Sequence, residues 1–133
     1  MANDAGGQGG TIAVVPVKAL TDAKSRLAPI LTADERRALT LRMLHGVLAA
    51  LDLPEIAARL VVSPSPQVLR AAQAAGTATL EQTGHGLNNA LVEGREWAAG
   101  GGAGAILVVL GDLPLLTAAD VAAMLDLAAD GVP

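Results

Sequence analysis

The chain has 133 residues, of which 52% are hydrophobic and 17% charged, and its formal net charge is -4. A domain usually runs to about 100 to 150 residues, so this length suits a single domain, and the hydrophobic share excludes an intrinsically disordered chain. The sequence contains no cysteine, which excludes disulfides, thiolate metal sites and cysteine nucleophiles, and its only aromatic residue is Trp97.

The first ten residues, MANDAGGQGG, are rich in glycine and predict a flexible leader over residues 1–10. They lack the basic and apolar regions of a secretory signal, and no run approaches the roughly 18 apolar residues of a membrane helix. We therefore expect a soluble, cytoplasmic protein with no membrane partner. An acidic chain without Tyr or Phe is also poorly suited to nucleic acid, so no nucleic-acid partner is expected.

The first half of the chain alternates strand and helix patterns. The short β-branched run that ends at Pro16 predicts a strand, and Thr32 with Glu35 forms a capping-box pattern ahead of a helix with leucines at helical spacing. Residues 60–62 predict a second strand. A helix over about residues 67–75 is expected to end at Gly76, because glycine readily adopts positive φ.

The second half continues this alternation. Residues 77–80 predict a third strand, residues 87–99 a helix, and residues 105–110 the most apolar strand of the chain. Thr117 with Asp120 offers a variant cap for a last helix. Apolar strands that alternate with helices imply parallel βαβ units with helices on both faces, which is a three-layer α/β fold. Ligands of such sheets bind beyond the carboxyl ends of the strands.

Cationic side chains follow the first predicted strand. Residues 11–70 carry eight basic and five acidic residues, whereas residues 71–133 carry one basic and seven acidic ones. Lys18, Lys24 and Arg26 fall within nine residues, so they can clamp a polyphosphate, with the lysines as point charges and the arginine as a bidentate donor. The alternative is a set of solvated loop charges. The segment matches neither the P-loop nor the G-x-G-x-x-G pattern.

Asp112 follows the fourth predicted strand in the tetrapeptide Gly111-Asp112-Leu113-Pro114. A carboxylate in this place can bind Mg²⁺, which commonly takes one or two protein carboxylates together with substrate phosphates. The alternative is an ordinary turn, since Gly, Asp and Pro are frequent turn residues.

A glycine-containing segment, GHGLNN, follows the third predicted strand. Glycines before a helix let backbone N–H groups approach a ligand closely, and the side chain of Asn88 can hydrogen-bond a ribose or a base. The alternative for Asn88 is a helix cap. His85 has no neighbouring histidine or cysteine, which argues against a zinc site.

Four segments, each after one predicted strand, resemble a known family: PVKALTDAKSRL, VVSPSP, GHGLNNA and VVLGDLPLLT. Together they are similar to the 2-phospho-L-lactate guanylyltransferase family, whose bacterial branch is described as phosphoenolpyruvate guanylyltransferase. The resemblance implies a nucleotidyltransferase fold of the glycosyltransferase-A, Rossmann-like type and a role in coenzyme F-420 biosynthesis. The implied reaction transfers GMP from GTP to phosphoenolpyruvate or 2-phospho-L-lactate and releases pyrophosphate.

The resemblance also implies roles for individual residues. The catalytic cations that hold the triphosphate correspond to Lys18, Lys24 and Arg26. The nucleotide-binding positions correspond to Ser25, Ser63, Gly86 and Asn88. The magnesium ligand corresponds to Asp112.

Members of this family are longer, and the resemblance implies a later segment that binds the phospho-acid and completes the metal site. Residues 11–133 are therefore expected to form the nucleotide-binding part of an apparently truncated nucleotidyltransferase domain. A sheet that lacks strands leaves an open edge, from which we expect instability or a homodimer. A non-catalytic α/β nucleotide-binding remnant or interaction module, and a related transferase acting on sugar phosphates, are the alternatives.

Overall fold

The computed structural model describes residues 10–18, 30–111 and 117–129. They form one parallel sheet whose strand order is β3-β2-β1-β4. The strands are β1 (Thr11–Pro16), β2 (Ile56–Ser63), β3 (Ala78–Glu81) and β4 (Ala105–Val108). The helices are α1 (Ala33–Ala50), α2 (Pro66–Ala74), α3 (Gly86–Gly100) and α4 (Ala118–Ala129).

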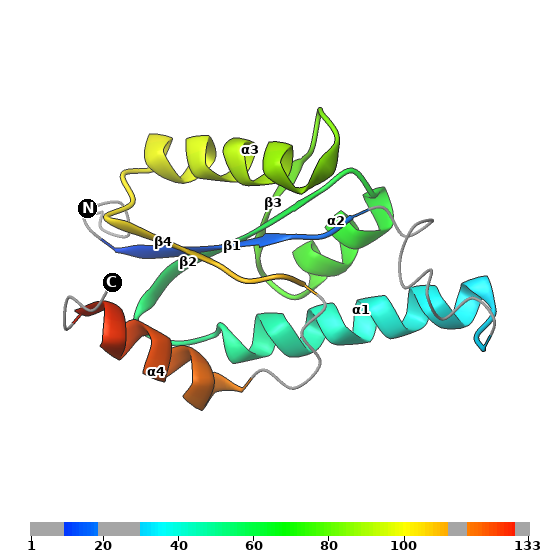
Figure 1. Ribbon diagram of the computed structural model, residues 1–133, viewed down its shortest axis with the longest axis horizontal. Coiled ribbons are helices and arrows are strands. Elements are labelled where there is room, and N and C mark those ends of the chain that lie inside the picture. Colours follow the sequence, from blue (N-terminus) through cyan, green and yellow to red (C-terminus); the bar gives the residue numbers. More distant parts are fainter. Residues whose placement is uncertain (1–9, 19–29, 112–116, 130–133) are drawn as a thin grey trace.

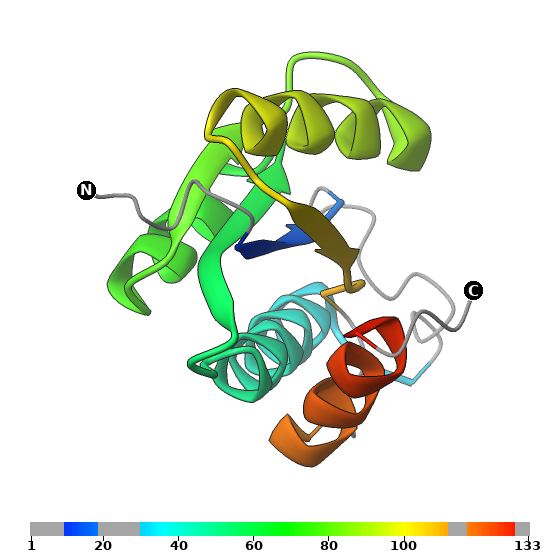
Figure 2. The same cartoon turned by 90° about the vertical axis from the view of Figure 1, so that its left-hand side faces the viewer.

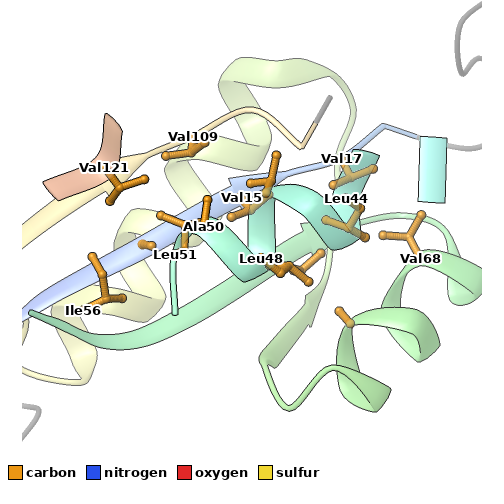
Figure 3. Packing of buried hydrophobic residues seen from close by; sticks show 14 residues of the cluster. Val15, Val17, Leu44, Leu48, Ala50, Leu51, Ile56, Val68, Val109 and Val121 are labelled. Atoms are coloured by element: carbon orange, nitrogen blue, oxygen red, sulfur yellow. The ribbon is translucent and has the colours of Figure 1, made fainter. Parts of the chain in front are cut away.

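Helices cover both faces of the sheet, as Figures 1 and 2 show, which confirms the three-layer α/β prediction. Successive side chains of a strand point to opposite faces. Ala13 and Val15 of β1 accordingly join the core beneath α1, α2 and α4, whereas Ile12 and Val14 join the core beneath α3. The larger core is aliphatic throughout (Figure 3).

Reciprocal caps begin two of the helices, as the sequence predicts. The Thr32 hydroxyl accepts the backbone N–H of Glu35 at 3.1 Å, and the Glu35 carboxylate accepts the N–H of Thr32 at 2.8 Å. Thr117 and Asp120 make the same exchange at 3.1 Å each, ahead of α4. Gly76 adopts a φ of 84° just after α2, which confirms its expected role at the end of that helix.

The element boundaries differ from the prediction in two places that matter. β2 begins at Ile56, four residues before the predicted start, because its pairing with β1 begins there, where Ile56 lies opposite Thr11. Ile56 is buried, and the partly buried Arg59 donates to the carbonyl oxygen of Leu48 at 2.8 Å. The regular ladder of β4 ends at Val108 instead of reaching residue 110. Pairing continues less regularly beyond it, since the N–H of Val109 donates to the carbonyl oxygen of Val14 at 3.0 Å.

The fourth strand is less buried than its apolar sequence indicates. β4 lies at the edge of the described sheet, and Ile106, Val108 and Leu110 are 36%, 46% and 42% exposed. The reason is topological, because within the described residues β4 has a neighbouring strand only on its β1 side. No helix among the described residues has the length and hydropathy needed to cross a membrane.

Candidate functional site

The carboxyl ends of all four strands meet at one edge of the sheet, and hydrogen bonds beyond the strand ends hold them in register. The N–H of Val17 donates to the carbonyl oxygen of Val62 at 2.9 Å, and that of Gln82 donates to Ser63 at 2.9 Å. The N–H of Gly111 lies 3.4 Å from the carbonyl oxygen of Pro16. The segments that follow β1, β2, β3 and β4 therefore start side by side, as expected for a ligand site of this fold.

Lys18 is exposed and follows Val17, whose buried side chain anchors the end of β1. Gly111 packs tightly against this anchor, because a Cβ at position 111 would lie 2.6 Å from Cγ2 of Val17. Only glycine permits this approach without a shift of its neighbours. Gly111 is therefore held close beside the end of β1.

Four of the predicted site residues lie outside the described residues: Lys24, Ser25, Arg26 and Asp112. Their predicted convergence with Lys18 remains a prediction. Within the described residues, no group of three or more His, Asp or Glu side chains gathers to hold a metal ion. The role of Asp112 as a magnesium ligand stays a prediction, and its carboxylate is a donor that Mg²⁺ commonly takes.

Ser63 has a structural role that its sequence context does not reveal. Its side chain is 0% exposed, and its hydroxyl accepts the N–H of Ser65 at 3.1 Å. The Ser65 hydroxyl in turn accepts the N–H of Val68 at 3.3 Å and caps α2. Ser63 therefore shapes the turn after β2, and its contact with a nucleoside stays a prediction.

Residues 82–86, named here the glycine loop, connect β3 to α3 and lie against the first two turns of that helix. The buried side chain of Gln82 donates to the carbonyl oxygen of Gly86 at 3.0 Å and to Oδ1 of Asn89 at 2.9 Å. A Cβ at Gly84 would lie 2.3 Å from Nδ2 of Asn89, so the loop touches the helix directly. Gly86 has a φ of 85°, which favours glycine at that position.

The two adjacent asparagines at the start of α3 have different surroundings. Asn89 is half-buried and bonded to Gln82, whereas Asn88 is exposed. The cap of α3 is His85, which gives no side-chain hydrogen bond to the helix, so the alternative role of Asn88 as the cap is not met. The contact of the exposed Asn88 with a ligand stays a prediction.

Glu93 completes the support of the glycine loop from the second turn of α3. Its carboxylate accepts the Thr83 hydroxyl at 2.8 Å, the Thr83 N–H at 3.1 Å and the Gly84 N–H at 3.2 Å. The hydrogen bonds from Thr83, followed by that from Gly84, lower the pKa of Glu93 below its ordinary value of 4.5, against a smaller opposing effect of burial. The carboxylate is therefore ionised at neutral pH.

Sequence reasoning missed Gln82, Asn89 and Glu93. Glu93 stands ten residues after Thr83, so its contact depends on how α3 packs and follows no local pattern. The one available signal was the pair of glycines in the loop, because glycines allow the backbone to approach another group closely. At Gly84 the group approached is the Asn89 side chain of α3.

The comparisons with known proteins agree with this arrangement. The sequence pattern of the family described as "Guanylyl transferase CofC like" matches residues 11–132. The chain belongs to this family. The match includes all four strands and the segments that follow their carboxyl ends, so the predicted resemblance is confirmed.

Two relatives carry informative names. Phosphoenolpyruvate guanylyltransferase from Rubrobacter xylanophilus is 52% identical over 119 residues, which are 90% of this chain and 58% of the relative. 2-phospho-L-lactate guanylyltransferase from Methanothermobacter thermautotrophicus is 36% identical and is covered over 52% of its length. The chain thus spans little more than half the length of these relatives.

A solved structure supports the fold. A nucleotide-diphospho-sugar transferase from Desulfovibrio desulfuricans G20 superimposes with a TM-score of 0.73 at 16% identity, over 90% of this chain and 55% of that one. At this identity the similarity concerns the fold alone. It agrees with the predicted nucleotidyltransferase fold.

Proposed function

We propose that this chain is the nucleotide-binding part of a guanylyltransferase that transfers GMP from GTP to phosphoenolpyruvate or 2-phospho-L-lactate, a step of coenzyme F-420 biosynthesis. The observation that carries the proposal is the 52% identity to phosphoenolpyruvate guanylyltransferase over 119 residues, which are 90% of this chain. The meeting of these segments at one sheet edge supports it, because this is where such folds bind ligands.

In the proposed reaction, a phosphate oxygen of the phospho-acid attacks the α-phosphorus of GTP. A new P–O–P bridge forms between the phospho-acid and the α-phosphorus. The bond from the α-phosphorus to the oxygen that links it to the β-phosphate breaks, and pyrophosphate leaves with that electron pair. A phosphate monoester has a second pKa near 6, so the nucleophile is already mostly dianionic at neutral pH. No general base is required for this step.

The protein must instead hold two polyanions in line and stabilise the charge that develops on the leaving group. Lys18, Lys24 and Arg26 would bind the triphosphate, with the arginine as a bidentate partner. Mg²⁺ bound by Asp112 would supply further neutralisation. Gly86 and Asn88 would seat the nucleoside, together with Ser25 and the turn that Ser63 supports.

The proposal also concerns the acceptor substrate and self-association of the chain. The relatives carry names for two different acceptors, phosphoenolpyruvate and 2-phospho-L-lactate, so either is a candidate here. The exposed apolar side chains along β4 also make self-association at that edge part of the proposal.

Pyrophosphate release tests the proposed function. The purified chain is mixed with GTP, Mg²⁺ and either phosphoenolpyruvate or 2-phospho-L-lactate, and pyrophosphate is followed with time. Release with one acceptor supports the transferase and identifies its substrate. GTP binding without release with either acceptor would leave a nucleotide-binding module and reject catalysis by this chain.

A further inference from the structure

The glycine loop is held in one conformation by side chains that are not themselves candidates for ligand contact. Gln82 bonds the last residue of the loop through the carbonyl oxygen of Gly86, and Glu93 bonds the residues in its middle, Thr83 and Gly84. Both ends and the centre of the loop are thereby fixed to α3. Asn88 lies two residues after the loop, in the first turn of α3, and is exposed.

The hydrogen bonds of the Glu93 carboxylate go mainly to this loop, with one more to Asn89 on the same helix. Three donors from two consecutive residues converge on its carboxylate, and one of them is the hydroxyl of an exposed threonine. Glu93 is absent from both hydrophobic core clusters of the described residues. A carboxylate with several donors fixes a loop strongly, because charge-assisted hydrogen bonds are about twice as strong as neutral ones.

Fixing this loop matters because glycine loses more conformational freedom on ordering than any other residue. A loop that orders only when its ligand arrives lowers the affinity by the free energy of that ordering. A loop that is already ordered avoids this loss. The hydrogen bonds from Glu93 should therefore raise the affinity for any ligand that the loop contacts.

We propose that Glu93 is a positioning residue for the guanine nucleoside: by holding Thr83 and Gly84 against α3, it keeps Gly86 and Asn88 ordered before the nucleotide binds. The inference rests on the proposed function, since the ligand is the nucleotide of that reaction. It adds a residue that acts without touching the ligand. It also predicts that this residue affects the nucleoside end of GTP and leaves the triphosphate end, at Lys18, unaffected.

The test compares Glu93→Gln with Glu96→Gln, a matched control on the exposed side of the same helix. The amide that replaces the Glu93 carboxylate would turn N–H groups toward the donors of Thr83 and Gly84, so at least one hydrogen bond is lost. Calorimetric titration of the full chain with GTP in Mg²⁺ should show a dissociation constant raised about tenfold for Glu93→Gln, from the loss of a hydrogen bond to a charged group. Glu96→Gln should bind as the unchanged protein does.

Two further measurements separate positioning from a general loss of structure. Inorganic triphosphate, which lacks the nucleoside, should bind Glu93→Gln and the unchanged protein equally. Amide hydrogen exchange at Thr83 and Gly84 should speed up in Glu93→Gln, with exchange in β1 and β2 unaltered. A melting temperature close to that of the unchanged protein is expected alongside.

Each other outcome overturns the inference in a recognisable way. Unaltered GTP affinity of Glu93→Gln, or equal weakening of GTP and inorganic triphosphate, would reject the positioning role while the proposed function stands. If the unchanged protein fails to bind GTP at all, the proposed function falls, and this inference falls with it. Faster exchange throughout the sheet would show that Glu93 supports the whole fold.

Discussion

Gly94 of α3 lies directly over Val14 of β1, so closely that a Cβ at position 94 would come within 2.6 Å of Cγ1 of Val14. The helix and the central strand approach each other here because glycine carries no side chain. This contact sets the distance between α3 and the sheet, and thereby the place of the glycine loop at the start of α3.

Gly94→Ala should destabilise the protein despite the better helix propensity of alanine. The gain in propensity is at most about 1 kcal/mol, whereas overpacking a well-filled core costs about 1 to 3 kcal/mol. We expect a net loss of about 1 kcal/mol in the free energy of unfolding, measured by urea denaturation.

Gly46→Ala is the control for that change. Gly46 lies in α1, is exposed, and a Cβ added there would have no neighbouring atom within 4 Å. The substitution should stabilise the protein by up to about 1 kcal/mol, from propensity alone. Stabilisation by both substitutions would show that α3 does not pack closely against β1.

The Glu93 contacts predict a pH dependence at the glycine loop. The pKa of Glu93 is lower in the folded protein than its ordinary value of 4.5, so the ionised carboxylate contributes stability that is fully present above 4.5. That contribution is lost as the pH falls through the lowered pKa. Titration followed by NMR at the Thr83 and Gly84 amides should show the loop loosening only below pH 4.5.

Glu93→Gln provides the comparison for this titration, because it removes the ionisable group. In this variant the two amides should show no transition in the acidic range. A transition of Thr83 or Gly84 that is the same in both proteins would mean that another group titrates there.

The edge of β4 predicts a surface for self-association. The N–H groups of Val109 and Gly111 point to β1, so alternation along the strand directs the backbone groups of Val108 and Leu110 away from it. Val108 also exposes its apolar side chain. Val108→Lys should weaken self-association, because a charged side chain at a sheet edge opposes pairing with another strand.

Val92→Lys is the matched control, since Val92 is likewise apolar and exposed but lies on α3. Sedimentation velocity over a range of concentrations compares the two variants with the unchanged protein. A larger monomer fraction in Val108→Lys alone supports association at the edge. A protein that is fully monomeric without any substitution would exclude it.

Local signals predicted much of this fold. The Thr32–Glu35 capping box and the glycine at position 76 act within a few residues of their own positions, so the sequence reveals them directly. The amino-terminal half of β2 was not predicted, because an arginine such as Arg59 is not typical of a strand inside a sheet. Its place depends on the carbonyl oxygen of Leu48, at the far end of α1.

The candidate site was predicted less completely than the fold. The topology brings Lys18, Ser63, Gly86 and Gly111 to one sheet edge, as the strand-end argument predicts. The burial of Ser63 and the support from Glu93 arise from tertiary packing, which a local pattern does not encode. The edge position of β4 depends on which strands neighbour it, and its apolar sequence suggested burial instead.

The most direct test of the shared triphosphate site is a calorimetric titration with GTP, in Mg²⁺ and again in a chelator. We predict that Lys18→Ala weakens binding about tenfold through the loss of a charged contact. Asp112→Asn should abolish the dependence on Mg²⁺, and Arg37→Ala, whose partner is the exposed Asp34 on α1, should bind as the unchanged protein does. Equal effects of Lys18→Ala and Arg37→Ala, or the same affinity with and without Mg²⁺ in the unchanged protein, would contradict a magnesium-assisted triphosphate site at this edge of the sheet.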